Sequence, residues 1–308
     1  MQLRGSFVAL VTPFTHTGAV DFKTLEELIL WHIEEGSDGI VLCGTTGESP
    51  TLSTQEKLAI FETGVRVAKG KIAIVAGVGS YNTEDSVSLC LGAKALGVDG
   101  ALVVVPYYNR PTPEGCFLHY EQLNRVELPM IVYHHPGRTG VKLSVETLER
   151  ICSLSHVVGI KECSCDMSFA VDLFQIVKCP IFAGDDGLIV PMMASGACGI
   201  ISVVAKAIPR MWKELTTLLL DGHLGEAQMV FARYYPLISA LGLETNPQPI
   251  KYALSLLGKC RPTYRLPLIP PAPSTQEAIR AVFLPQEGVH FFRQEGCHLG
   301  RCPACEMG

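Results

Sequence analysis

The sequence lacks any apolar run near the roughly 18 residues that a membrane-spanning helix requires, so we expect no membrane span. It also lacks a basic stripe. Its 25 Lys and Arg residues face 30 Asp and Glu residues, and the net charge of −5 argues against nucleic acid as a partner. The first 13 residues hold only a short apolar stretch ending at Thr12-Pro13, which predicts a strand rather than a signal peptide. Together these absences predict a cytoplasmic protein.

What is present is a chain of 308 residues, 48% hydrophobic and 18% charged, which suits one large or two modest domains. Its twelve cysteines are scattered through apparent core segments, and we interpret most of them as small buried side chains in a reducing compartment. Near the end, Cys297, His298, Cys302 and Cys305 have the composition of a zinc ligand set. Because their spacing is irregular, we predict a mobile tail with incidental thiols and no metal.

Eight apolar, β-branched runs predict eight strands. They are Phe7–Thr12, Ile40–Cys43, Ile72–Val78, Ala101–Val105, Met130–Tyr133, Val157–Lys161, Ile181–Ala183 and Gly199–Val204. Segments with helical periodicity lie between them, namely Phe22–Glu35, Thr54–Val67, Thr83–Leu96 and Val145–Leu154. Strand starts recur every ~30 residues, which is the rhythm of βα units and predicts an α/β fold, a (β/α)8 barrel. An open doubly wound sheet is disfavoured because no G-x-G-x-x-G motif follows the first strand.

After residue 224 the strand signal stops and helical patterns take over. The predicted helices are Leu224–Leu241, Ile250–Leu257 and Thr275–Phe283, with a proline-rich linker before the last. We therefore predict a catalytic barrel over residues 1–224, a small C-terminal helical domain over residues 225–285, and a cysteine-containing tail over residues 286–308.

Lys161 ends the apolar run Val157–Lys161, where an unpaired ammonium seldom belongs. Desolvation at such a position lowers the pKa of a lysine and makes the amine a nucleophile at neutral pH. The alternative is a lysine at a strand end that forms an ion pair with Glu162 or another acid.

Polar segments also follow the other predicted strands, at the ends where the chemistry of a (β/α)8 barrel is located. They are Gly44–Glu48, Pro106–Pro111, Tyr133–Gly140, Lys161–Glu162 and Gly184–Asp186. Hydroxyls, phenols, an arginine and a lysine thus converge on one rim. This composition indicates an amine-catalysed carbonyl site, in which the Gly44–Glu48 loop binds a carboxylate.

These segments also have purely structural interpretations. Gly44–Glu48 is alternatively a turn and helix cap, Tyr107 and Tyr108 are alternatively packing aromatics, and Arg138 is alternatively part of a surface ion pair. The adjacent His134 and His135 suggest a metal site. We predict none, because no carboxylate or cysteine lies at ligand spacing on that loop.

Taken in order, these pieces resemble the pyruvate-dependent class I aldolases and, within them, the dihydrodipicolinate synthase family. The matching pieces are Val11–Pro13, Gly44–Glu48, Tyr107–Pro111, Tyr133, Pro136–Thr139, Gly159–Glu162, Gly184–Asp186, Ile201–Val203 and Asn246-Pro247. The resemblance runs from about residue 5 to about residue 283 without large gaps. The Thr45-Thr46 pair and the Pro-x-Arg-Thr loop favour this family over its sugar-acid relatives.

The resemblance implies a condensation in the diaminopimelate route to lysine, an activity of a lyase. Lys161 would form a Schiff base with pyruvate, and the enamine would attack the aldehyde of L-aspartate 4-semialdehyde. Tyr133 would be the proton donor and acceptor at the imine. Thr45 would link Tyr133 to Tyr108 of a neighbouring subunit in a proton relay.

The resemblance also implies the binding residues. Thr46 would bind the pyruvate carboxylate, and Arg138 would bind the carboxylate of the semialdehyde, where a bidentate guanidinium fits. Gly184 and Ile201 would line the lysine pocket. Neither a metal nor an organic cofactor is implied, and the usual assembly is a homotetramer built from two dimers.

The chain departs from this family at three places that matter, one of which is the tail after about residue 285, which has no counterpart in the family. His134-His135 stand where members commonly have asparagine and an aliphatic residue, and histidines there would either titrate near neutral pH or fill space. At the lysine feedback site, Lys57 would repel a lysine ligand and Tyr81 would crowd it, so we predict weak or absent inhibition by lysine.

Three other functions compete with this one. Another pyruvate-type aldolase, such as an N-acetylneuraminate lyase or a 2-keto-3-deoxy sugar acid aldolase, would keep Lys161 and Tyr133 but has less use for Arg138. A non-catalytic pyruvate-binding barrel is disfavoured by the intact lysine, tyrosines and threonine. A phosphate-binding barrel isomerase is disfavoured because no Gly-rich phosphate loop follows the last two strands.

Overall fold

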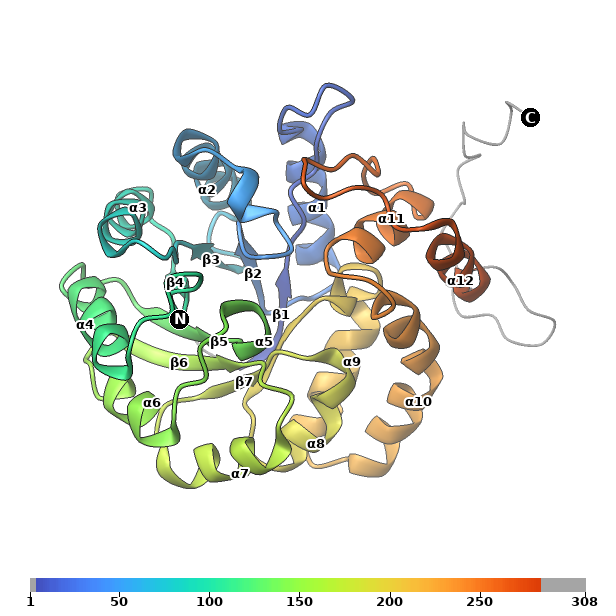
Figure 1. Ribbon diagram of the computed structural model, residues 1–308. Helices are drawn as coiled ribbons and strands as arrows, with labels where there is room; N and C mark the ends of the chain where they lie inside the picture. Colours follow the sequence, from blue (N-terminus) through green and yellow to red (C-terminus); the bar gives the residue numbers. More distant parts are fainter. Residues whose placement is uncertain (1–3, 284–308) are drawn as a thin grey trace.

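The computed structural model describes residues 4–283 and has eight parallel strands that close into a barrel in chain order (Figure 1). The strands are β1 (Gly5–Ala9), β2 (Gly39–Leu42), β3 (Ala73–Gly77), β4 (Gly100–Val104), β5 (Met130–His134), β6 (Val157–Glu162), β7 (Ile181–Ala183) and β8 (Gly199–Ser202). β8 pairs with β1 and so leaves no free sheet edge. The (β/α)8 barrel predicted from the strand rhythm is confirmed.

Helices surround the barrel and cover its outer face (Figure 1). Those of the barrel are α1 (Phe22–Glu34), α2 (Thr54–Ala68), α3 (Thr83–Ala95), α4 (Pro113–Asn124), α5 (Pro136–Thr139), α6 (Val145–Cys152), α7 (Met167–Ile176), α8 (Ile189–Ala194) and α9 (Pro209–Leu220). Short 3-10 turns η1 (Ser49–Thr51), η2 (Asp186–Leu188) and η3 (Val204–Lys206) follow β2, β7 and β8. Side chains before the helices cap them, as Ser53 does for α2 in a reciprocal capping box with Glu56.

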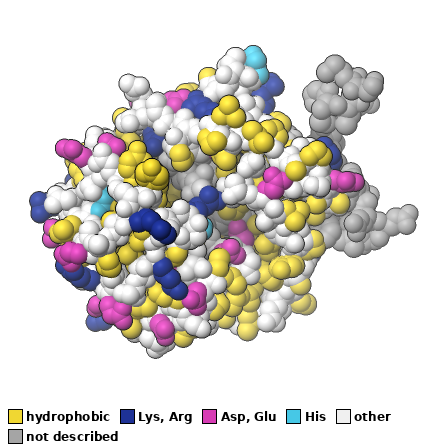
Figure 2. All heavy atoms as spheres, in the orientation of Figure 1, with side chains coloured by type: hydrophobic (Ala, Val, Ile, Leu, Met, Phe, Trp, Pro, Cys, Tyr) yellow, Lys and Arg dark blue, Asp and Glu magenta, His cyan; other side chains and the backbone are white. Residues whose placement is uncertain are grey.

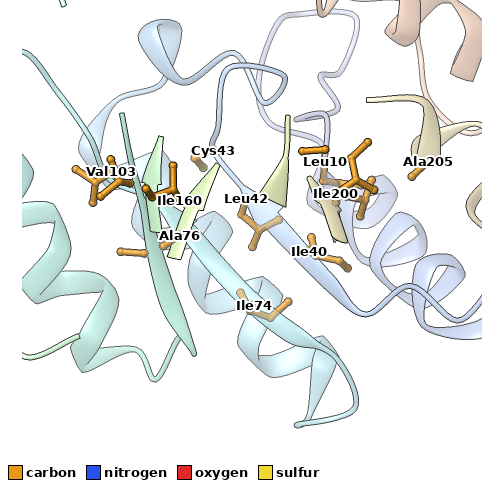
Figure 3. Close-up of a cluster of buried hydrophobic side chains, with 14 of the residues drawn as sticks. Leu10, Ile40, Leu42, Cys43, Ile74, Ala76, Val103, Ile160, Ile200 and Ala205 are labelled. Atoms are coloured by element: carbon orange, nitrogen blue, oxygen red, sulfur yellow. The ribbon is translucent and has the colours of Figure 1, made fainter. Parts of the chain in front are cut away.

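The strands alternate between two apolar layers, as the two-residue period of a strand requires. Val41 and Val75 point into the barrel, where they pack with residues such as Phe182 and Ile201. Their neighbours Ile40, Leu42, Ile74 and Ala76 belong instead to the layer between strands and helices, where Figure 3 shows them among side chains of other strands. Because both faces are buried, each strand reads as a continuous apolar run in the sequence.

The first strand begins and ends earlier than its apolar run predicts. Phe7–Thr12 is the apolar stretch, but pairing with β8 starts at Gly5, opposite Gly199. Gly199 has φ +157°, and a Cβ added there would collide with the backbone of Gly5, so the close contact requires glycine. Leu10 and Thr12 are buried beyond the ladder.

Three helices follow the barrel: α10 (Leu224–Leu241), α11 (Gln248–Leu256) and α12 (Pro273–Phe283). The predicted bounds of α10 are confirmed. α10 contacts α8, α9 and α12, while α11 contacts η3 at the rim where the strands end (Figure 1). These contacts cover one side of the barrel and bring the segment around α11 over its carboxyl end. That the helices form a separate domain stays a prediction.

Two ion pairs attach this C-terminal segment to the loop after β2 and to α2. Lys251 Nζ donates to Glu48 Oε1 at 2.5 Å, and neither side chain has exposed surface. The Arg265 guanidinium donates to both carboxylate oxygens of Glu56, and its backbone N–H donates to Glu48 Oε2 at 3.1 Å. The loop that carries Thr45 and Thr46 is therefore held by residues about 200 positions further along the chain.

Within residues 4–283, no helix is both long and apolar enough to span a membrane. The cysteines of this part of the chain are all free, and they are mostly buried or half-buried, as expected. The predicted tail over residues 286–308, with Cys297, His298, Cys302 and Cys305, lies outside the described residues.

Candidate active site

Lys161 and Tyr133 lie side by side near the carboxyl end of the barrel. They occupy β6 and β5, and the strand register pairs them directly. Lys161 Nζ lies 4.5 Å from the centre of the Tyr133 ring, and both side chains are buried. Register between neighbouring strands thus places an amine against a phenol in a site from which most water is excluded.

Lys161 is not half of an ion pair with Glu162. The alternation of β6 directs Glu162 to the other side of the strand, where its carboxylate accepts a hydrogen bond from His134 Nδ1 at 2.6 Å. The structure therefore does not form the predicted pairing of Lys161 with Glu162.

The pKa of Lys161 is raised above its ordinary value. Burial, the largest single influence, acts to lower the pKa, but negative charge on Tyr133, Cys163 and Asp186 acts in the opposite direction and prevails. The lowered pKa expected from burial alone is thus wrong, because that expectation left out the neighbouring groups. Burial also raises the pKa of Tyr133.

Thr45 and Thr46 occupy the loop after β2, where they were expected. The Thr45 hydroxyl hydrogen-bonds the Tyr133 phenol, which acts against the rise in the pKa of Tyr133. Thr46 is buried, and its Oγ1 accepts a hydrogen bond from Asn246 Nδ2 at 2.9 Å. One threonine therefore contacts the phenol, and the other faces a residue of the C-terminal segment.

Asn246 connects two of the predicted binding residues. Its amide donates to Thr46, and its backbone carbonyl accepts a hydrogen bond from Arg138 Nη2 at 3.0 Å. Its Oδ1 is buried and has no hydrogen-bond partner among the described residues, so an acceptor is available to a ligand. Sequence reasoning noted the Asn246-Pro247 motif but gave it no role, because nothing local links it to Thr46.

Gly184 lies next to Lys161, whereas a contact of Ile201 with the lysine stays a prediction. A Cβ at Gly184 would lie 3.0 Å from Lys161 Cε and would overlap the Cys163 sulfur, so only glycine leaves room for the amine to move. Ile201 is fully buried in the layer inside the barrel that also contains Tyr133.

Arg138 lies in α5, directly after β5, and its side chain is exposed. Its positive charge acts on the pKa of Tyr133, His135 and Lys161, so the guanidinium lies close to all three. The His135 ring lies 5.8 Å from the Tyr133 ring, centre to centre. In Figure 2, this face of the molecule is recessed near its middle, and Lys or Arg side chains lie at the recess.

The two histidines of this loop have different surroundings. Burial, reinforced by Arg138, lowers the pKa of His135 to about 4, so it is neutral at neutral pH and does not titrate there. His134 is fully buried between Glu162 and the Leu143 backbone N–H, which donates to its Nε2 at 3.2 Å. Nδ1 must then carry the hydrogen that Glu162 accepts, which fixes the tautomer. Among residues 4–283, no group of His, Cys, Asp and Glu side chains could hold a metal ion.

Tyr108 is the one predicted catalytic residue that the fold does not bring to the others. It lies in the loop after β4 with φ +67°, is 87% exposed, and has its ring 6.5 Å from that of Tyr81. Its contact with Thr45 across a subunit boundary stays a prediction.

The comparisons with known proteins agree with this geometry. Residues 2–284 match the model of the dihydrodipicolinate synthetase family. The chain belongs to the dihydrodipicolinate synthetase family. It is 42% identical to the 4-hydroxy-tetrahydrodipicolinate synthase of Trichlorobacter lovleyi over 284 residues, which cover 91% of this chain and 98% of the relative.

Two solved structures of this family superpose closely on the fold. The dihydrodipicolinate synthase of Aquifex aeolicus is 40% identical with a TM-score of 0.90, and the match covers 91% of this chain and 97% of that one. The chloride-inhibited dihydrodipicolinate synthase of Acinetobacter baumannii, complexed with pyruvate, is 39% identical with a TM-score of 0.90 and coverages of 92% and 98%.

Two buried groups beside the dihydrodipicolinate synthetase motifs were missed by sequence reasoning. Asp186 accepts hydrogen bonds from the backbone N–H groups of Val203 and Val204, and Lys206 donates to the Ala9 carbonyl at 2.8 Å. Burial raises the pKa of Asp186 and holds that of Lys206 well below its usual range, and the charge of Lys161 lowers the latter further. Lys161 thus lies close to a second buried lysine and a buried carboxylate.

Proposed function

We propose that this chain is a 4-hydroxy-tetrahydrodipicolinate synthase, a lyase that condenses pyruvate with L-aspartate 4-semialdehyde in the diaminopimelate pathway of lysine biosynthesis. The observation that carries the proposal is the buried pair of Lys161 and Tyr133, aligned by strand register, with Thr45 hydrogen-bonded to the phenol. Membership of the dihydrodipicolinate synthetase family supports the same activity.

The amine of Lys161 attacks the C2 carbonyl of pyruvate, and loss of water leaves an imine. Because the pKa of Lys161 is raised and Tyr133 is neutral, the amine needs a route for its proton before it attacks. Tyr133 accepts this proton as it passes its own phenolic proton to Thr45, and the Thr45 hydroxyl passes its proton on towards the Tyr108 ring supplied by a neighbouring copy of the chain. The same relay runs in reverse when the hydroxyl formed at C2 leaves as water.

Loss of a proton from the pyruvate methyl group converts the imine to an enamine. Its C3 attacks the aldehyde carbon of the semialdehyde, forming the new carbon–carbon bond. The substrate amine then attacks C2, which closes the ring and expels Lys161 unchanged. The scheme needs no metal or organic cofactor, because the lysine itself supplies the electron sink as the imine.

The proposed binding roles follow from the donors around the amine. The Thr46 hydroxyl and the N–H groups of its loop bind the pyruvate carboxylate. Arg138 binds the carboxylate of the semialdehyde, since its exposed guanidinium lies near Tyr133 and Lys161. The orphaned Oδ1 of Asn246 accepts a hydrogen bond from the same substrate.

We further propose that the active form is an oligomer, a homotetramer of two dimers. Tyr108 is 87% exposed on its own subunit, which is unusual for a tyrosine with a catalytic role. Insertion of this ring beside Thr45 of the partner subunit would complete the relay. A cytoplasmic location, expected from the sequence, stays a prediction.

The test is reduction with borohydride in the presence of pyruvate, read by mass spectrometry, together with turnover of aspartate semialdehyde. The parent is expected to gain one reduced pyruvyl group on Lys161, and Lys161→Ala none. Lys142→Ala, which removes an exposed lysine, is the matched control and should be labelled like the parent. An adduct without turnover of the semialdehyde would favour the sugar-acid aldolases, and no adduct would refute the Schiff base.

A further inference from the structure

Two cysteine sulfurs meet at the amino-terminal end of the barrel, away from the active site. Cys152 is the last residue of α6, and Cys179 lies two residues before β7. Their Sγ atoms are 2.9 Å apart, and both residues are half-buried. A disulfide bond is about 2.05 Å long, so the sulfurs need to approach by less than about 1 Å to become bonded.

One of the two sulfurs faces an open surface cavity of about 350 Å³. Cys179 lines it together with Lys178 and Cys198, whereas Cys152 does not. The cavity is large enough to admit a small reagent to Cys179. Reagents therefore reach one member of the pair first.

The two thiols are hydrogen-bonded to each other. This hydrogen bond with Cys179 raises the pKa of Cys152 most, and burial raises it further. Because Cys179 lines the cavity and Cys152 does not, Cys179 is the sulfur that a reagent reaches first. Cys198 lines the same cavity, but burial raises its pKa to about 12, which makes it a poor nucleophile.

We propose that Cys152 and Cys179 are a dithiol site that hydroperoxides oxidise to an intramolecular disulfide. The Cys179 thiolate attacks the terminal oxygen of the hydroperoxide, the O–O bond breaks, and the alcohol or water leaves with the proton. Cys152 then attacks the resulting sulfenic sulfur, the S–S bond forms, and water leaves. Two thiols lose two electrons, and the hydroperoxide accepts them.

The position of the pair predicts the effect of the link. The disulfide would close a loop from residue 152 to residue 179, which contains all of β6 and therefore Lys161. The catalytic side chains lie at the opposite end of the strands, so turnover per subunit is expected to stay unchanged. Closing such a loop restricts the unfolded chain, and Tm is expected to rise by roughly 5 °C.

The experiment exposes the full chain to hydrogen peroxide, blocks remaining thiols, and maps tryptic peptides without reduction. We expect the peptide Ile151–Lys161 joined to Cys179–Lys206, which dithiothreitol should separate again. Because the second peptide also contains Cys198, variants assign the link. Cys198→Ser is the matched control and should still form it, while Cys152→Ser and Cys179→Ser should not, and neither should gain in Tm on oxidation.

Three results would overturn the proposal. One is a linked peptide that persists in Cys179→Ser, which would assign the bond to Cys198. Another is oxidation of Cys179 to its sulfinic acid in the parent without any linked peptide. The third is a link that forms only after the chain has been unfolded in denaturant.

Discussion

Replacement of Lys251 by methionine removes half of the buried ion pair that fixes the loop after β2. Lys251 Nζ donates to Glu48 at 2.5 Å and lies 4.1 Å from the centre of the Phe14 ring, with no exposed side-chain surface. Its loss leaves the Glu48 carboxylate buried, with a hydrogen bond from the Arg265 backbone N–H. A buried charge that loses its partner destabilises a protein by about 3–5 kcal/mol.

This loss in the free energy of unfolding can be expressed as a fall in the melting temperature, Tm. Unfolding entropy is about 2.1 cal/mol/K per residue, or about 0.6 kcal/mol/K for 308 residues, so Tm should fall by about 5–8 °C. Lys23→Met is the matched control. Lys23 is 87% exposed, and its ion pair with Glu27, 3.9 Å between Nζ and Oε1, should contribute little to stability. Calorimetry should be done at one protein concentration, since assembly would shift Tm.

The double variant Glu48→Gln/Lys251→Met removes both charges and should regain most of the loss. The coupling free energy between the two sites is then about 2–4 kcal/mol. Glu48 lies two residues after Thr46, in the loop after β2 that we propose binds the pyruvate carboxylate. Lys251→Met should therefore also raise the pyruvate concentration needed for half-maximal borohydride trapping. Additive losses in the double variant, or a single loss below about 1 kcal/mol, would refute this account of the pair.

Three further predictions concern catalysis, acid stability and regulation. Tyr133→Phe should lower turnover about 10²–10³-fold. It should also lower the pKa of Lys161, because Tyr133 is the neighbour that most raises that pKa. An unchanged pH profile of borohydride trapping would contradict this. Arg265 lowers the pKa of Glu56 from 4.5 to about 2, so this pair contributes stability above pH 4.5 that is lost as pH falls towards 2. Acid unfolding of Arg265→Gln should therefore depend less on pH in that window than unfolding of the parent, and parallel curves would argue against the pair. Lysine should leave activity nearly unchanged because of Lys57 and Tyr81, and half-inhibition below the millimolar range would disprove it.

Most elements of this fold could be predicted because the signals that specify them are local. The apolar period of Leu224–Leu241 predicts the observed α10, and the continuous apolar runs predict strands buried on both faces. The exception is β1, which starts at Gly5 because pairing with Gly199 of β8 sets its bounds. A strand is defined by its neighbour as well as by its own side chains, and the neighbour here is far along the chain.

The site was predictable as a set of residues but less so in its electrostatics. The polar segments at strand ends predict that Lys161 and Tyr133 lie at one rim of the barrel. The register of β5 and β6 confirms that the two residues are paired. The direction of the Lys161 pKa shift did not follow, since it depends on Tyr133, Cys163 and Asp186 together. From the sequence alone, His135 could titrate near neutral pH. Its burial beside Arg138 lowers its pKa to about 4, and neither influence can be read from the sequence.

Periodicity, turn residues and motif order therefore account for the barrel, the nucleophile and the likeness to a family of aldolases. Closure of the chain in three dimensions accounts for the Thr46–Asn246 and Glu48–Lys251 contacts, which join positions 200 or more residues apart. No local pattern encodes such pairs. Burial and charge at a side chain depend on every segment that packs within a few ångströms of it, and those segments meet only in the folded molecule.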